Sequence, residues 1–170
     1  MTADLCFVAR AAEILDSFRR HLGRDLVERS GNPAEDARRL FDAPFAVLAH
    51  DTSPKPRLDW ANLAAARAFD ATPESLLGRP SADTAPADAV ADRRALFDVL
   101  SRQGVVTGYS GVRISLTGRR FRIEDVSIFE LIDEDGRPAG HAAVIERIRA
   151  VEPSFAPPDL ASFPKPAPPS

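Results

Sequence analysis

The stretch from Gly104 to Ile148 constrains the fold more than any other part of the chain, because it predicts three consecutive β-strands. Val, Ile, Phe and Tyr are interleaved with charged residues there, and turn signals at Thr117-Gly118 and at 133–136 divide the stretch into three segments. Asp135-Gly136 is the strongest of these signals, since glycine accepts the positive φ that tight hairpin turns require. The stretch therefore predicts a three-stranded antiparallel meander, whose apolar face another part of the chain must cover.

The first of the three segments shows the two-residue period most clearly. Val112, Ile114 and Leu116 fall on one face of the predicted strand, and Arg113 and Ser115 fall on the other. Side chains alternate between the two faces of a strand, so one face is expected to be buried and the other solvated. We expect the apolar side chains to point inward and Arg113 to lie in solvent.

The N-terminal part of the chain is predicted to be helical. Apolar residues recur at the 3.6-residue period over residues 4–29, with Gly23 as a stop or kink, and a short helix is expected over 34–41. The apolar stripe of the first helix must be buried, either against the chain's own sheet or in a homodimer interface. Its residues, our interface candidates, are Phe7, Ala11, Ile14, Leu15, Phe18 and Leu22.

Two further strands are predicted before the meander. Residues 44–50 form a short apolar segment with 57–60 as its hairpin partner, and short helices follow at 63–69 and from Thr72. A longer helix, which starts at Pro86 or Asp88 and is closed by Gly104, leads into the meander. The order predicts an α+β fold: a five-stranded antiparallel sheet with short helices on one face and an N-terminal helical extension.

Composition places the chain among soluble proteins and excludes several classes. The 170 residues suffice for one domain with extensions, and a net charge of −3 gives no reason to expect binding to nucleic acid or to a membrane. No apolar run reaches the roughly 20 residues of a membrane span, so we expect a cytoplasmic protein. The prolines that follow Arg149 predict a disordered Pro-rich tail over 150–170.

Several motifs resemble the PAS fold. The segment WANLAA at 60–65 is similar to the Asn-x-Ala-Ala start of the first short PAS helix, and TPESLLGRP at 72–80 is similar to the helix and Gly-Arg-Pro segment that follows it. Asp133 to Arg137 and Gly140-His141 resemble the last hairpin of that fold. The resemblance implies a domain that senses, dimerises or docks.

A narrower resemblance is to the MEKHLA domain, a PAS-like family that occurs in bacteria as small stand-alone proteins and in plants within transcription regulators. It rests on PFAVLAHDT at 44–52, GVRIS at 111–115, GRRFRIED at 118–125 and LIDEDG at 131–136, and it covers about residues 5–148. The resemblance implies a bacterial protein with an N-terminal helical extension at 1–43 and a PAS-like domain at 44–149.

The residues that could carry sensory chemistry are few. The one cysteine, Cys6, lies outside the PAS-like part, which argues against a covalent flavin–cysteine adduct, and the helix before the meander has no histidine to ligate haem. His21, His50 and His141 are too scattered to propose a metal site. The sequence contains no catalytic constellation, so we expect a protein that is not an enzyme.

A cavity between the sheet and its helices is where a ligand is expected in such a fold. Two functions follow: a sensory module that binds a small ligand and signals through contacts with a partner or second copy, or a ligand-free dimerisation or interaction module. For the first, the pocket candidates are Phe45, Val47, Trp60, Phe69, Leu77, Phe97, Leu100, Tyr109, Ile114, Phe121, Ile123, His141 and Val144.

Overall fold

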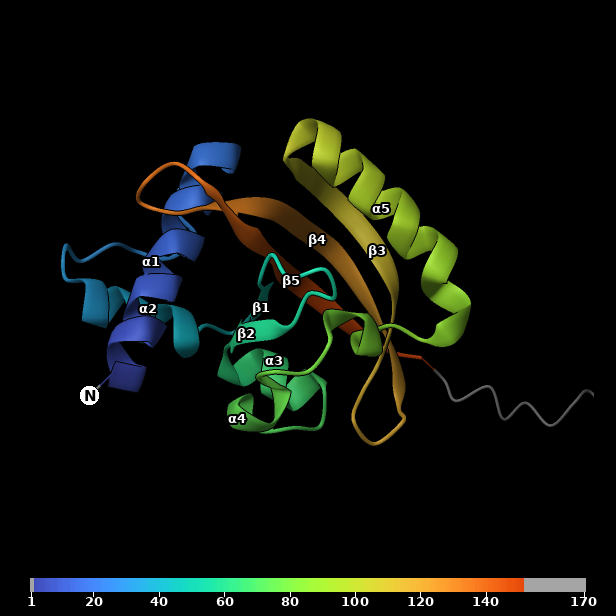
Figure 1. Ribbon diagram of the computed structural model, residues 1–170. Coiled ribbons are helices and arrows are strands. Elements are labelled where there is room, and N and C mark those ends of the chain that lie inside the picture. The colour runs from blue at the N-terminus through green and yellow to red at the C-terminus, as the bar shows by residue number, and fades with distance from the viewer. Residues whose placement is uncertain (1, 152–170) are drawn as a thin grey trace, which may run out of the picture.

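A five-stranded antiparallel sheet forms the centre of the protein (Figure 1), of which a computed structural model describes residues 2–151. The strand order is β2-β1-β5-β4-β3, so the N-terminal hairpin pairs with the last strand of the meander. The predicted fold class is confirmed, while residues 152–170 of the predicted tail lie outside the described part. The strands are β1 (Ala46–His50), β2 (Leu58–Ala61), β3 (Val105–Ile114), β4 (Arg120–Ile132) and β5 (Pro138–Ala150).

The helices begin and end where capping residues place them. Side chains of Asn32, Asn62 and Thr72 accept hydrogen bonds from the first turns of their helices, and Gly104 ends the longest central helix with φ 75°. The helices are α1 (Thr2–Leu22), α2 (Pro33–Phe41), α3 (Leu63–Ala68), α4 (Pro73–Leu76) and α5 (Val90–Gln103), with 3-10 turns η1 (Ser81–Thr84) and η2 (Ala87–Ala89).

The first helix is shorter than the sequence predicts. We expected it over 4–29, but it ends at Leu22, where Gly23 takes φ 72° and its N–H donates to the carbonyl of Arg19. Residues 24–29 lead back instead to α2, where Arg29 and the backbone N–H of Ser30 bind the buried carboxylate of Asp36. The competing interactions around Asp36 explain why the apolar period does not continue as helix.

Helices cover both faces of the sheet (Figure 1). On one face α1 and α2 bury an outer core, and on the other α3, α4 and α5 bury a cavity-side core. The outer core contains Ala11, Ile14, Leu15, Phe18, Ala37, Leu40, Val47, Ala49, Trp60, Phe129, Leu131, Ala142 and Val144. The cavity-side core includes Leu48, Leu58, Phe69, Leu96, Leu100, Phe121, Ile123, Val126, Ile128 and Ile145.

A break in the pairing of β3 with β4 decides which side chains enter each core. The register shifts on both sides of the Tyr109–Val126 pair, and Asp125 of β4 adopts φ 53°. Before this irregularity the odd-numbered Ile123 faces the cavity side, and after it the even-numbered Ile128 does. An extra residue in a strand reverses the alternation beyond it, which is what a β-bulge does.

Candidate ligand cavity

A cavity of about 70 Å³ lies between α5 and the sheet. Its wall is mainly aliphatic and aromatic, and strands β1, β4 and β5 supply the floor. Apolar side chains in the wall include those of Leu48, Leu58, Phe69, Leu96, Phe97, Ile123, Val126, Ile128 and Ile145. A concave, mostly apolar space with a few polar groups is the usual form of a small-molecule site.

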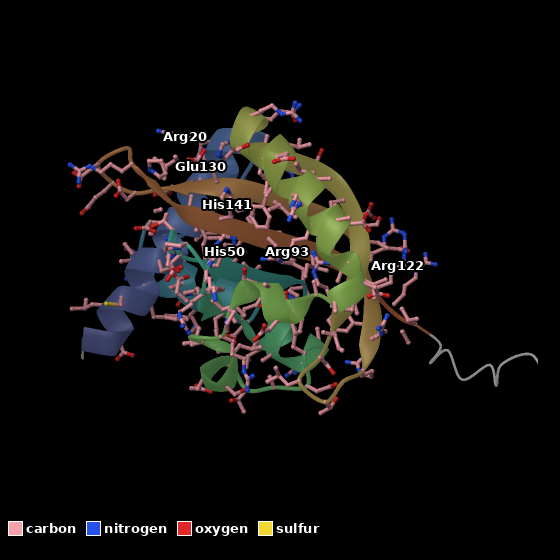
Figure 2. All side chains as sticks on the ribbon, turned by 45° about the vertical axis from the view of Figure 1, so that its right-hand side comes forward. Arg20, His50, Arg93, Arg122, Glu130 and His141 are labelled. Atoms are coloured by element: carbon pink, nitrogen blue, oxygen red, sulfur yellow. The ribbon has the colours of Figure 1, made fainter. Side chains whose placement is uncertain are left out.

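Two histidines stand side by side in this wall. His50 ends β1 and pairs in register with His141 of β5, and their ring centroids are 5.2 Å apart. Phe97 of α5 packs on both rings, at 5.9 Å from His50 and 5.7 Å from His141. Figure 2 shows the two histidines together in the space beneath α5. The sequence left open which face of β5 carries His141, and it is the cavity face.

Burial holds both imidazoles in the neutral form. Desolvation and, after it, the neighbouring His50 together lower the pKa of His141 to about 4. The pKa of His50 is also lowered, chiefly by burial, although the carbonyl of Asp51 opposes that shift. A neutral imidazole has one donor and one acceptor. Nδ1 of His50 donates to the carbonyl of Asp51 at 2.9 Å, so His50 offers a guest molecule only its Nε2 acceptor.

Two arginines reach the same cavity from different elements. Arg93 comes from α5, and Arg113 comes from β3. Figure 2 shows Arg93 on the same side of the sheet as His50 and His141. The prediction that Arg113 lies in solvent is wrong: Arg113 is 8% exposed and Ser115 5%, whereas Leu116, expected inside, is 39% exposed.

The register of the sheet explains the reversal at Arg113. Arg113 pairs directly with Phe121, and directly paired residues present their side chains on the same face. Phe121 belongs to the cavity-side core, so Arg113 must face inward as well. The long stem of an arginine can lie along apolar surface while its head stays near polar groups.

The structure separates the predicted pocket residues into four groups. Phe69, Phe97, Ile123 and His141 line the cavity. Leu100 and Phe121 are in the cavity-side core and Tyr109 packs against it, but none of the three forms the cavity wall.

The prediction is wrong for the remaining pocket candidates, which lie outside the cavity. Val47, Trp60 and Val144 belong to the outer core beneath α1, and Phe45 packs against that core. The reason for Val47 and Val144 is that they pair with each other, next to the cavity-facing pair Leu48–Ala143, so strand alternation turns them away. Leu77 is 45% exposed at the end of α4, and Ile114 follows the inward Arg113 and faces outward.

The apolar stripe of α1 is buried on the chain's own sheet. Ala11, Ile14, Leu15 and Phe18 are at most 1% exposed, and Phe18 meets Phe129 edge to face at 5.6 Å. Phe7 stacks on Trp60 at 5.2 Å, and Leu22 packs against the same core. Of the two expectations for this stripe, the structure shows the intramolecular one.

The described residues limit which cofactors fit. Cys6 is exposed on α1, which lies on the opposite face of the sheet from the cavity. A cavity of about 70 Å³ is well below the roughly 300–1,000 Å³ of sites for drug-sized ligands, so a flavin or a haem does not fit without rearrangement. Within residues 2–151 no cluster of metal-binding side chains occurs, and no helix there is both long and apolar enough to cross a membrane.

Arg93, Arg113 and His50 also line the cavity, although they are not among the residues predicted for it. His50 follows the alternation of β1 after Leu48 and could have been assigned to the cavity face from the pattern. Arg93 and Arg113 carry no such signal, because charged residues on a helix and on a strand are ordinarily solvated.

The fold is that of PAS domains. It resembles the PAS domain of a protein from Colwellia psychrerythraea, with TM-score 0.58, 14% identity, and 69% of this chain and 94% of that chain covered. An RNA-binding light-oxygen-voltage receptor gives TM-score 0.59 and 20% identity over 71% of this chain and 33% of that one. A PAS domain in complex with ethanol, from a LuxR-family transcriptional regulator of Burkholderia thailandensis, gives TM-score 0.50 and 16% identity over 63% of this chain and 92% of that one.

Within that fold class the chain belongs to the MEKHLA domain family, whose match covers residues 8–150. The match begins inside α1, so the helix that seals the outer core is part of the family's unit. No functionally curated protein matches the chain in sequence.

Proposed function

We propose that the protein is a sensory module that binds a small molecule in the cavity beneath α5 and signals through contacts with another protein. The observation that carries this proposal is the cavity itself, an apolar space into which His50, His141, Arg93 and Arg113 converge. Convergent polar groups in an apolar wall orient a ligand, whereas a core that serves packing alone gains nothing from them. The role is one of binding rather than catalysis.

The size of the cavity supports a small guest. One water needs about 10–15 Å³ of such space, so 70 Å³ accommodates on the order of five non-hydrogen atoms. A PAS domain of similar fold forms a complex with ethanol, a molecule smaller than this limit, which supports a guest of this class. We place the alternative, a ligand-free dimerisation module, second, because the α1 stripe that motivated it is already buried.

Ligand binding in the cavity is transmitted to the protein surface through α5. Arg93 and Phe97 of that helix form part of the wall, and the carbonyl of Leu100 receives the N–H of Gly104, where β3 begins. A guest that contacts Arg93 or Phe97 changes the position of α5 relative to the sheet, and the exposed side of α5 can present that change to a partner.

A cavity-filling variant tests the proposal. Ala143 lines the cavity, and Ala143→Val occupies part of it without adding a polar group. Ala150→Val, at the exposed end of the same strand, is the matched control. We expect short alcohols and acids to raise the melting temperature of the wild type and of Ala150→Val, and to have at least tenfold weaker effect on Ala143→Val. Equal effects on all three proteins, or none on the wild type, would overturn the proposal.

A further inference from the structure

The charges in the cavity wall are all of one sign. Arg93 and Arg113 line it together with the two histidines, Ser81 and Thr84, and the wall contains no aspartate or glutamate. Asp83 lines a surface groove beside Arg93 but forms no ion pair with it. The cavity therefore presents a positive field to a guest.

Neither arginine has a counter-ion in the described part of the chain. Ion pairs over residues 2–151 engage arginines such as Arg29 and Arg119, and none of them engages Arg93 or Arg113. Arg113 is buried and Arg93 is half-buried. A guanidinium withdrawn from water without a carboxylate is costly, since desolvation is not offset by attraction to an opposite charge. Burial and the nearby charge of Arg113 accordingly lower the pKa of Arg93.

Each guanidinium has more N–H donors than the acceptors around it use. Nη2 of Arg93 donates to Oγ of Ser81 at 2.6 Å, which fixes the head at the cavity wall, and the ring of Phe97 lies 5.0 Å from its Cζ. Nη1 of Arg113 donates to the carbonyl of Val112 at 2.9 Å, and Tyr109 lies beneath its guanidinium. A guanidinium has five N–H donors, so both heads retain N–H groups for a ligand.

We propose, resting on the proposed function, that the ligand is a short-chain monocarboxylate, with its carboxylate bound by Arg93 and Arg113 and its alkyl end among the apolar side chains of β4 and β5. A carboxylate matches the planar fork of a guanidinium and can accept two parallel hydrogen bonds from it. The space admits a molecule on the order of five non-hydrogen atoms, the size of propionate or butyrate. The remaining wall, with Ile123, Val126 and Ile145, suits two or three methylenes.

The test is calorimetric titration of the full chain with propionate, with its neutral isostere propionamide, and with 1-propanol. We expect propionate to bind saturably, with an affinity in the micromolar to millimolar range, and propionamide to bind at least tenfold more weakly. Arg93→Gln and Arg113→Met should each weaken propionate at least tenfold and leave 1-propanol within about twofold. Arg94→Gln, an exposed neighbour on α5, is the control and should change neither ligand.

The outcomes separate the two proposals. If 1-propanol and propionamide bind as well as propionate does, the cavity takes small molecules but the carboxylate assignment is wrong. If none of the three compounds binds, both the carboxylate assignment and the proposed function are wrong. If Arg94→Gln weakens propionate as much as Arg93→Gln does, the anion binds on the surface and the assignment is overturned. Arg93→Gln carries the test alone if circular dichroism shows that Arg113→Met is unfolded.

Discussion

Nη2 of Arg10 donates a hydrogen bond of 3.0 Å to the carbonyl oxygen of His50, and so ties α1 to the residue whose ring lines the cavity on the other face of the sheet. The same guanidinium pairs with Asp59 at 2.9 Å and with Glu13 at 2.7 Å. Burial raises the pKa of Asp59, and Arg10 opposes that shift. Arg10 therefore stabilises the contact of α1 with the β1–β2 hairpin.

Loss of Arg10 should weaken this contact. We expect Arg10→Met to lower the free energy of unfolding by about 1–3 kcal/mol, because the His50 carbonyl and the Asp59 carboxylate lose their donor. Carboxyl NMR titration should show the pKa of Asp59 rising further. Arg19→Met, which removes an exposed pair with Asp25 on the same helix, should cost under about 1 kcal/mol. Equal losses from the two variants would contradict this role for Arg10.

Gly140 lies against the same carbonyl and tolerates no side chain. Its φ is 113°, and a Cβ there would overlap the carbonyl oxygen of His50. We expect Gly140→Ala to cost more than about 3 kcal/mol, since β1 and β5 would have to separate. Gly136→Ala is the control, with a positive φ of 79° but open space around it, and it should cost only about 1–2 kcal/mol. Chemical denaturation of both variants measures the difference, and a difference near zero would refute the close packing.

Asn62 joins three elements through a fully buried side chain. Its Oδ1 accepts from the N–H groups of Val47 and Ala65, each at 3.0 Å, and its Nδ2 donates to the carbonyls of Leu40 and Phe45. We expect Asn62→Ala to cost about 3 kcal/mol or more, because it leaves several buried backbone groups without partners.

A second cap provides the comparison for Asn62. Thr72 caps the exposed helix α4, so Thr72→Ala should cost only about 0.5–2 kcal/mol. Thermal unfolding of the two variants checks the order, and a larger loss at Thr72 would contradict the central role of Asn62.

The depressed pKa of His141 predicts that the fold weakens in mild acid. The folded state resists protonation down to a pKa of about 4, whereas the unfolded chain protonates near 6.5. Stability is therefore full above pH 6.5 and falls as the pH drops toward 4, by on the order of 2 kcal/mol. The groups around the imidazole include His50, Arg93 and Glu130, which pairs with His141 on β4.

Urea unfolding at pH 4.5 and pH 7.5 tests this dependence. His141→Asn should reduce the loss of stability between the two pH values, while His50 accounts for the loss that remains. An unchanged pH dependence in the variant would mean that His141 is not buried in its neutral form.

Local signals predicted most of the fold because caps and turns act within a few residues. Pro33, Asn62, Thr72, Gly104 and Gly136 each act where the sequence places them. The last hairpin followed from these signals together with the two-residue period, whereas the order of the strands within the sheet was not predicted. Gly23 also marks the end of α1, but the non-helical path of residues 24–29 was not predicted, because the interactions of Asp36 with Arg29 and Ser30 are made across a turn.

The cavity could be predicted only in part, because its wall depends on register. The irregularity at Asp125 reverses the alternation along β4, and a single aspartate within a run of strand-forming residues is too weak a signal to predict it. The inward position of Arg113 depends on its pairing with Phe121, which is a long-range choice. Val47 and Val144 were misassigned because both faces of β1 and β5 are apolar, so that composition does not distinguish the cavity face from the α1 face.

Propionate binding is tested most directly by an NMR measurement of contacts between ¹³C-labelled propionate and the methyl groups of the 170-residue chain. If propionate binds beneath α5, nuclear Overhauser effects connect its methyl group to Ile123, Val126 and Ile145, and none connects it to Val47 or Val144 on the α1 face. Contacts confined to the outer core or to surface methyls, or no contacts at saturating propionate, would contradict binding at this site.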